Sequence, residues 1–108
     1  METIKSREDI SDLFSSGKRL RTPYVTLIVL PTKQHDLHGR VAFIAGKKSG
    51  NAVWRNSAKR RMRAVCRDLE GPYQGFDVIF LAKSGICNAR YSKVLATCDD
   101  ALKRAGIR

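Results

Sequence analysis

The order of apolar and polar residues predicts a helix near the start of the chain. Ile10, Leu13 and Phe14 recur at helical spacing, so they share one face of a short helix. Ser6 is suited to cap the beginning of this helix, and Gly17 is a natural terminator just after its end.

Three further apolar runs predict strands. Residues 24–30 and 39–45 are rich in β-branched and aromatic side chains, and they lie close enough along the chain to pair as a hairpin. Residues 76–82 hold an uninterrupted apolar run, which is typical of a central strand that is buried on both faces. Residues 18–21 leave room for an additional short strand.

Two more helices complete the pattern. The longer one spans about residues 52–69 and is stopped by Gly71 and Pro72, and the last one begins near Asn88, a candidate cap. The order is about α-β-β-(β)-α-β-α. It predicts the α+β class: a single-domain α-β sandwich over residues 1–108, with a small, mostly antiparallel sheet and helices packed on it.

The longer helix has two contrasting faces when its residues are placed at 100° intervals. Apolar side chains gather within an arc of about 100° and are expected to pack on the sheet. They are Ala58, Met62, Val65, Cys66 and Leu69. A stripe about 60° wide is expected to face solvent. It consists of Asn56, Arg60, Arg63 and Arg67.

Positive charge concentrates in the same region. The net charge is +11 with a pI near 10.2, and residues 37–67 contain nine Lys or Arg and no Asp or Glu. Like charges three or four positions apart on a helix repel one another, and a merely solvated face would normally interleave Glu. The pattern therefore favours a phosphate-bearing partner, a nucleic acid, over a simple solvated surface.

The turn before the longer helix supports this interpretation. Gly46 and Gly50 allow a close backbone approach, Lys47 and Lys48 add charge, and the helix start contributes N–H groups. The string G-x-x-x-x-G-K-[ST] is absent, so the sequence gives no support to ATP or GTP binding.

Other classes of protein are disfavoured. The first residues lack an apolar secretory segment, and no apolar run approaches the roughly 18 residues of a membrane span, so we expect a cytoplasmic protein with no membrane partner. Cys66, Cys87 and Cys98 are odd in number and lack C-x-x-C spacing, which indicates small buried hydrophobes. His35 and His38 are expected to be loop histidines.

The acidic residues do not suggest a protein nuclease. Hydrolysis of a phosphodiester by protein-bound Mg²⁺ requires clustered carboxylates, whereas the ten Asp and Glu here are scattered over the first helix, loops and element ends. We expect no catalytic residue and no metal site made by the side chains of this chain alone. Its contribution should be electrostatic.

One string of residues resembles a known family. The signature of the bacterial ribonuclease P protein subunit is similar to Gly46-Lys47-Lys48-x-Gly50-Asn51-Ala52-Val53-x-Arg55-Asn56-x-x-Lys59-Arg60-x-x-Arg63. The surrounding order of elements agrees over nearly the whole chain. About twelve positions match at fixed spacing, so the resemblance is specific.

The resemblance implies a fold and a function. The implied fold is an α-β sandwich with a left-handed β-α-β crossover. The implied role is that of a monomer in a 1:1 ribonucleoprotein endoribonuclease, in which catalytic RNA removes the 5′ leader of precursor tRNA with Mg²⁺ bound mainly through RNA. A general RNA-binding or ribosomal protein without an associated enzyme is the alternative.

The same resemblance implies two groups of contact residues. The residues expected to bind the catalytic RNA are Lys47, Lys48, Asn51, Arg55, Asn56, Lys59, Arg60, Arg63 and Arg67. The cleft for the leader, between the first helix and the open sheet face, is expected to involve Ile10, Phe14, Tyr24, Thr26, Arg55 and Lys59. The register of the first strand leaves open whether Tyr24 or Thr26 faces this cleft, and Ile10 and Phe14 would serve equally well in the core.

Two positions depart from the family pattern. Ser57 stands where the family usually has Arg, and Arg61 is a candidate to replace that lost cation in part. Ile10 stands where an aromatic residue is common, so base stacking there is expected to be weaker.

Overall fold

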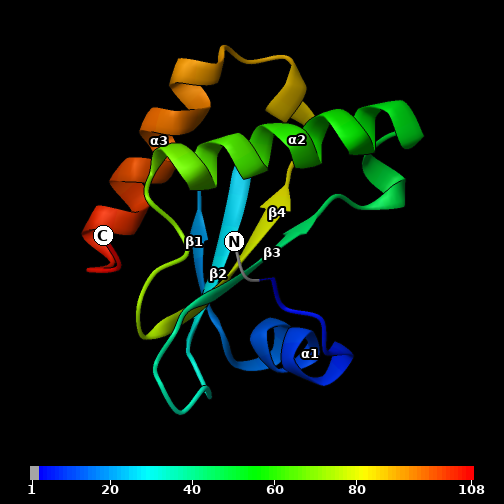
Figure 1. The fold of residues 1–108 in the computed structure, drawn as a ribbon. Helices are drawn as coiled ribbons and strands as arrows, with labels where there is room; N and C mark the ends of the chain where they lie inside the picture. The colour runs from blue at the N-terminus through cyan, green and yellow to red at the C-terminus, as the bar shows by residue number, and fades with distance from the viewer. Residues whose placement is uncertain (1–2) are drawn as a thin grey trace.

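The computed structural model describes residues 3–108 and arranges them around one four-stranded sheet (Figure 1). The elements in chain order are α1 (Arg7–Ser16), β1 (Lys18–Arg21), β2 (Val25–Pro31), β3 (Arg40–Ile44), η1 (Lys47–Ser49), α2 (Ala52–Asp68), β4 (Phe76–Ala82), η2 (Ser84–Cys87) and α3 (Tyr91–Arg104). The α+β class is confirmed, and the optional strand is present as β1.

The strand order is β1-β2-β4-β3. β1 pairs with β2 and β2 with β4 in antiparallel fashion, whereas β3 and β4 run parallel. The predicted hairpin of β2 and β3 is therefore wrong. The apolar strand β4 lies between them, because its side chains are buried on both faces and need a central position. The handedness of the β3-α2-β4 crossover stays a prediction.

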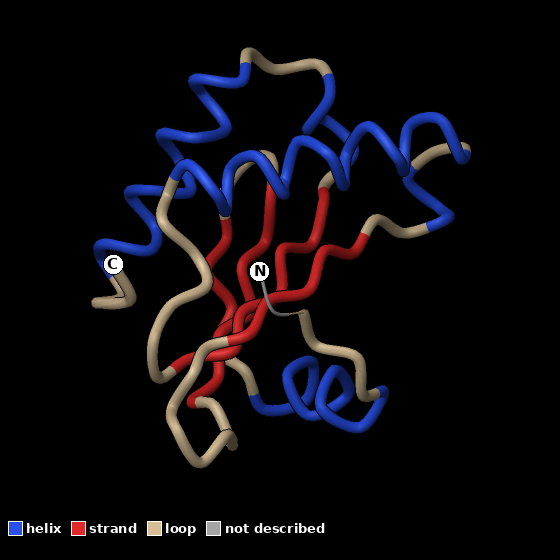
Figure 2. Tube along the Cα trace, viewed as in Figure 1, coloured by secondary structure: helices blue, strands red, loops and turns tan. Residues whose placement is uncertain are grey.

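Helices cover both faces of the sheet, as Figures 1 and 2 show. α2 lies over β3 and β4, and α3 lies over β1 and β2, and together they enclose the larger apolar cluster. α1 packs on the opposite face over β2 and β4. The smaller cluster beneath it consists of Ile4, Leu13, Ile28, Ala42 and Ile79.

The predicted helix ends need two corrections. Ser6 caps α1 as expected, since its hydroxyl accepts a hydrogen bond from the N–H of Asp9 at 3.4 Å. α3 begins later than predicted, with Arg90 rather than Asn88 at its N-cap, because residues 84–87 form the short turn η2. Gly17 follows α1 with φ −70° and ψ 148°, which is extended rather than left-handed backbone.

Gly17 is required by close packing, and this gives a direct test. A Cβ atom there would lie 2.4 Å from the carbonyl oxygen of Leu13 and 2.6 Å from a methyl group of Ile28. We expect Gly17→Ala to lower the free energy of unfolding by about 1–3 kcal/mol, as overpacking does. Gly46→Ala is the matched control, because Gly46 has φ −71° and ψ 148° and nothing within 4 Å of an added Cβ. Equal denaturant midpoints for the two variants would contradict this reading.

An ion-pair network of Arg40, Asp77 and Asp9 connects α1 to the sheet. Arg40, at the start of β3, donates to Asp77 in β4 through Nη2 at 2.7 Å and through Nε at 3.3 Å. Its Nη1 reaches Asp9 of α1 at 3.0 Å. The side chains of Arg40 and Asp77 are 12% and 5% exposed. The Asp77 and Asp9 carboxylates raise the pKa of Arg40, so the network holds a fixed positive charge between two acids.

The cysteines are free thiols, as the sequence indicated. Cys66 and Cys98 are buried in the larger cluster, and Cys87 packs against it. Burial raises the pKa of Cys66 to about 11 and that of Cys98 to about 12, so both thiols stay protonated near neutral pH. Within residues 3–108, no helix combines the length and apolar character needed to cross a membrane.

Candidate nucleic-acid interface

The outer face of α2 carries the cationic stripe that the helical wheel indicated. Asn56, Arg60, Arg63 and Arg67 are all exposed. The opposite face of the helix, from Ala58 to Leu69, is buried in the larger cluster. We call these four residues the α2 ridge. They share one side of one rigid helix, so the positive charges of Arg60, Arg63 and Arg67 act on the same partner surface.

Most of the ridge has no acidic partner. Within residues 3–108, Arg60 and Arg63 form no ion pair, and Arg67 contacts Asp68 through Nε at 3.4 Å. Both side chains of that pair are largely solvated, at 71% and 40% exposure, so it neutralises little of the ridge. The field of the ridge therefore remains available to phosphates.

The margins of α2 hold cationic side chains against the fold. The guanidinium of Arg63 lies 5.7 Å from the ring centroid of Phe43 in β3. Arg55 donates through Nη1 to the carbonyl of Gly50 at 3.2 Å. Arg55 and Lys59 are half-buried, so their stems rest on the protein while their charged ends reach its surface.

The segment before α2 is a 3₁₀ turn rather than an open loop. Lys47 and Lys48 are exposed on η1. Asn51 caps α2, because its Oδ1 accepts from the N–H of Trp54 at 3.0 Å, and the side-chain NH₂ takes no part in this cap. Trp54 packs against the larger cluster beside the turn, and a Cβ on Gly50 would lie 2.7 Å from its ring.

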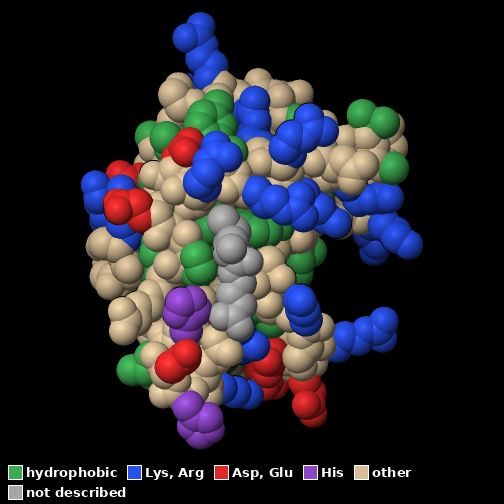
Figure 3. All heavy atoms as spheres, viewed as in Figure 1, with side chains coloured by type: hydrophobic (Ala, Val, Ile, Leu, Met, Phe, Trp, Pro, Cys, Tyr) green, Lys and Arg blue, Asp and Glu red, His purple; other side chains and the backbone are tan. Residues whose placement is uncertain are grey.

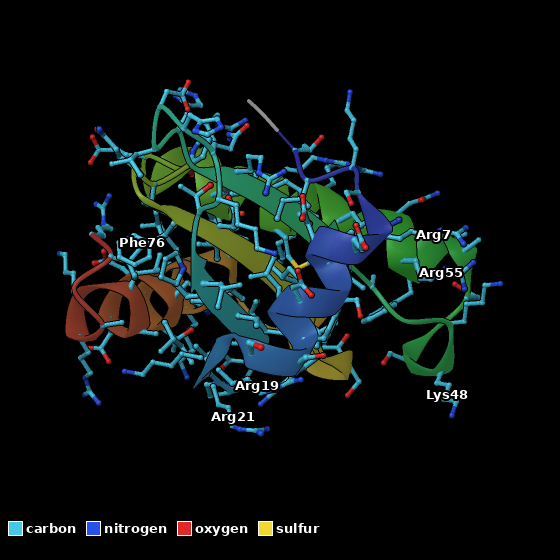
Figure 4. All side chains as sticks on the ribbon, turned by 90° about the horizontal axis from the view of Figure 1, so that it is seen from below. Arg7, Arg19, Arg21, Lys48, Arg55 and Phe76 are labelled. Carbon is cyan, nitrogen blue, oxygen red and sulfur yellow. The ribbon has the colours of Figure 1, made fainter. Side chains whose placement is uncertain are left out.

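Figure 3 shows how these charges are distributed in space. Lys and Arg side chains gather over α2 and its N-terminal end, and others stand across a notch, on the side of α1. Figure 4 places Arg7, at the start of α1, and Arg55, in α2, on the same side of the molecule. Arg7 was not among the predicted site residues, because the sequence does not show that the start of α1 lies on the same side of the molecule as Arg55.

The residues proposed for the leader cleft divide between the two sheet faces. Ile10 and Phe14 are half-buried on α1 and pack against the smaller cluster. Thr26 belongs to the same face of β2 as Ile28 but is only 5% exposed, so it offers little surface. Tyr24 packs against the larger cluster beneath α2 and α3. Tyr24 precedes β2 and does not follow the alternation of that strand, so it lies apart from Ile10, Phe14 and Thr26.

The guanidinium of Arg19 lies beside Phe14, and Arg19 was not among the predicted leader-cleft residues. The Arg19 guanidinium lies 5.7 Å from the Phe14 ring centroid and donates to the Phe14 carbonyl at 3.3 Å. Arg19 is exposed on β1. An aromatic ring beside a guanidinium is the pairing that suits stacked bases and their phosphates. This feature depends on the pairing of β1 with β2, which places Arg19 opposite Ile28.

Arg61, the candidate to replace the cation missing at position 57, is hydrogen-bonded to the protein itself. Its Nη1 donates to the carbonyl of Ile86 at 3.1 Å and to that of Ala89. The side chain is half-buried between α2 and the chain that leads into α3. Arg61 therefore connects these two segments through hydrogen bonds from its guanidinium to backbone carbonyls.

Several acidic side chains that the structure describes form ion pairs with Lys or Arg. No group of three or more His, Cys, Asp or Glu within residues 3–108 is arranged to hold a metal ion. Asp9 and Asp77 bind Arg40, while Asp99 binds Arg108 and Lys103. The side chains that the structure describes thus do not fit a divalent-ion site.

Comparison with known proteins agrees with this geometry. A family model described as Ribonuclease P matches residues 1–106. The ribonuclease P protein component of Streptococcus agalactiae is 32% identical over 104 residues, covering 96% of this chain and 94% of that protein. The component of Natranaerobius thermophilus is 40% identical over 83 residues, covering 75% and 70%.

Solved structures show the same fold. A mutant of the Staphylococcus aureus RNase P protein superposes with a TM-score of 0.84 at 24% identity, over 98% of this chain and 89% of that one. The Thermotoga maritima RNase P protein gives a TM-score of 0.79 at 24% identity, over 96% and 97%.

Proposed function

This chain belongs to the ribonuclease P family, and we propose that it is the protein subunit that binds a large catalytic RNA and the 5′ leader of precursor tRNA. In this role it assists the Mg²⁺-dependent endonucleolytic removal of the leader, which yields the mature 5′ end. The observation that carries the proposal is the α2 ridge, whose Arg60 and Arg63 are exposed and lack acidic partners within residues 3–108.

The ridge suits the backbone of a folded RNA. Lys47 and Lys48 extend its charge on one side, and Arg55 and Lys59 extend it along the margin of α2. Cations fixed on a helix neutralise phosphates at set spacings and release counterions, which is the main source of affinity for nucleic acids. Contacts to phosphates position a protein without reading bases, as a subunit that binds one shaped RNA requires.

The α1 side suits a single strand. Phe14 and Arg19 offer an aromatic face and a guanidinium, and Ile10 lies half-buried on the same helix. Single-stranded nucleic acid binds where bases stack beside cations. The 5′ leader is the single-stranded part of the proposed substrate, so we assign it to this side of the sheet.

The chain assists the chemistry without performing it. The described carboxylates bind cations of the protein and do not gather into a metal site, so we assign Mg²⁺ mainly to the RNA. The protein lowers phosphate repulsion and holds the substrate near the reacting bond. The same proposal places a monomer of this chain in a 1:1 ribonucleoprotein in the cytoplasm.

Reconstitution tests the proposal. The catalytic RNA of the source organism should cut the leader from a precursor tRNA slowly at low Mg²⁺, and adding this protein should accelerate that cleavage severalfold or more. The alternative, a general RNA-binding or ribosomal protein, predicts RNA binding with no acceleration. Mature tRNA as a competitor measures how much of the effect depends on the leader.

Phe14 provides a specific test of leader binding. We expect Phe14→Ala to reduce the preference for precursor over mature tRNA by about tenfold, because base–aromatic stacking contributes about 1–3 kcal/mol per base. Binding of catalytic RNA should change little. The control is Leu13→Ala, since Leu13 is 1% exposed and its truncation should lower stability by about 2–5 kcal/mol. If Phe14→Ala unfolds the protein and weakens both binding reactions equally, Phe14 is a core residue.

A further inference from the structure

A hollow of about 340 Å³ opens beside the α2 ridge, between α2 and the start of α3. It is lined by Ser57, Arg60, Arg61, Ala64 and Tyr91. We propose that this hollow receives one unpaired nucleotide of the RNA whose backbone lies on the ridge. The proposal rests on the RNA-binding role inferred above and adds a site at which a base, rather than a phosphate, is held.

The hollow exists because two positions on this side of α2 are small. Ser57 and Ala64 are seven residues apart, so they lie above one another two helical turns apart and leave a recess between the flanking side chains. A longer side chain at either position would occupy that space. The volume is at the low end of the roughly 300–1,000 Å³ typical of ligand sites, which favours one small planar group.

The walls of the hollow are fixed before any ligand arrives. The hydroxyl of Tyr91 donates to the carboxylate of Asp68 at 2.6 Å, which orients the ring. Burial and the Asp68 carboxylate raise the pKa of Tyr91 to about 12, so the hydroxyl remains a donor at neutral pH. Arg61 is held by the carbonyls of Ile86 and Ala89, which fixes its guanidinium. Aromatic rings and guanidinium planes are the surfaces on which unstacked RNA bases rest.

Arg60 links the hollow to the ridge. It lines the hollow and is also one of the exposed cations of the ridge. A strand with a phosphate on Arg60 brings the attached nucleoside to the mouth of the hollow. Charge complementarity therefore favours RNA as the occupant. An acidic peptide would find the same cations, but the fixed stacking surfaces would be of no use to its carboxylates.

The test compares variants that fill a hollow without changing charge. Ser57→Leu should weaken binding of the catalytic RNA by about tenfold, the loss of roughly one stacked base, and the dependence of affinity on salt should keep its slope because no phosphate contact is removed. Ala96→Leu is the matched control, because it adds a neutral Leu to a different hollow, of about 440 Å³, between β1 and α3. It should bind like the parent protein.

A second pair of variants keeps the test independent of folding at position 57. Tyr91→Phe retains the ring but loses the hydrogen bond to Asp68, so it should keep most of the affinity, whereas Tyr91→Ala should reproduce the loss. Chemical probing of the RNA should show one unpaired nucleotide that the parent protein protects and that Ser57→Leu and Tyr91→Ala expose. Parent-like affinity of folded Ser57→Leu and Tyr91→Ala, or no such nucleotide, would overturn the proposal. Failure of the parent protein to bind the RNA would instead overturn the proposed function.

Discussion

Replacing Arg60 and Arg63 together by Ala should weaken binding of the catalytic RNA by tenfold or more at low salt. Both side chains are exposed on the α2 ridge without an acidic partner among residues 3–108, so each is free to neutralise a phosphate. Each phosphate contact contributes about 0.9 to the slope of log affinity against log salt. The double variant should therefore reduce the magnitude of the slope by up to about 1.8, as measured by filter binding or fluorescence anisotropy over a salt series.

The control must remove the same charge elsewhere. Lys93 and Arg104 are exposed on α3, and Arg104 already pairs with Asp100 at 3.0 Å. Lys93→Ala with Arg104→Ala lowers the net charge by the same two units away from the ridge. We expect a much smaller change in slope for this pair. If both double variants lose affinity and slope alike, net charge rather than the ridge governs binding.

Replacing Arg40 by Met should lower the free energy of unfolding by about 3 kcal/mol. The substitution leaves Asp77 buried without its charged partner, and breaking a buried ion pair from one side typically costs about 3–5 kcal/mol. Asp77 keeps the backbone N–H of Arg40 at 3.2 Å, which places the expected loss at the lower end. Denaturant unfolding with constant slope, followed by circular dichroism, measures the change.

Two further variants separate charge from shape. Adding Asp77→Leu to Arg40→Met removes the stranded carboxylate and should recover much of the lost stability, because an apolar pair often replaces a buried ion pair at little cost. Lys33→Met disrupts the exposed pair of Lys33 and Asp12, at 61% and 45% exposure, and should change stability little. A double variant as unstable as the single one would show that the network contributes by its shape alone.

The same network should affect function through α1. Arg40 is the contact between the sheet and Asp9, so Arg40→Met should loosen the helix that carries Phe14. We expect the preference for precursor tRNA to fall more than the affinity for catalytic RNA, measured well below the unfolding midpoint of the variant.

The helices were predictable because their information is local. The 3.6-residue period of α2 alone separates the buried residues, such as Met62 and Val65, from the ridge. The cap at Ser6 and the buried strand β4 were predicted from local sequence in the same way. Local patterns of this kind specify which side chains face a core, and here that was sufficient to identify the cationic face.

Strand pairing was not predictable in the same way. Residues 24–30 and 39–45 were predicted as strands separated by one short loop, yet β4 lies between them in the sheet. One consequence for the site follows from this pairing: Arg40 meets Asp77 only because β3 lies parallel to β4. Tyr24 lies away from Phe14 for a local reason, since it precedes β2 and packs against the larger cluster.

The central position of β4 has a consequence for biosynthesis. β4 is the last strand to leave the ribosome, since it follows β1, β2, β3 and α2 in the sequence, yet β2 and β3 both pair with it and not with each other. The nascent chain therefore exposes its most cationic segment before the sheet that supports it can close, and completion depends on contacts distant in sequence. Translation of the first 75 residues should leave an unfinished, strongly basic chain in a compartment rich in ribosomal RNA. Rapid emergence of β4 would then limit the time during which this segment can bind that RNA indiscriminately.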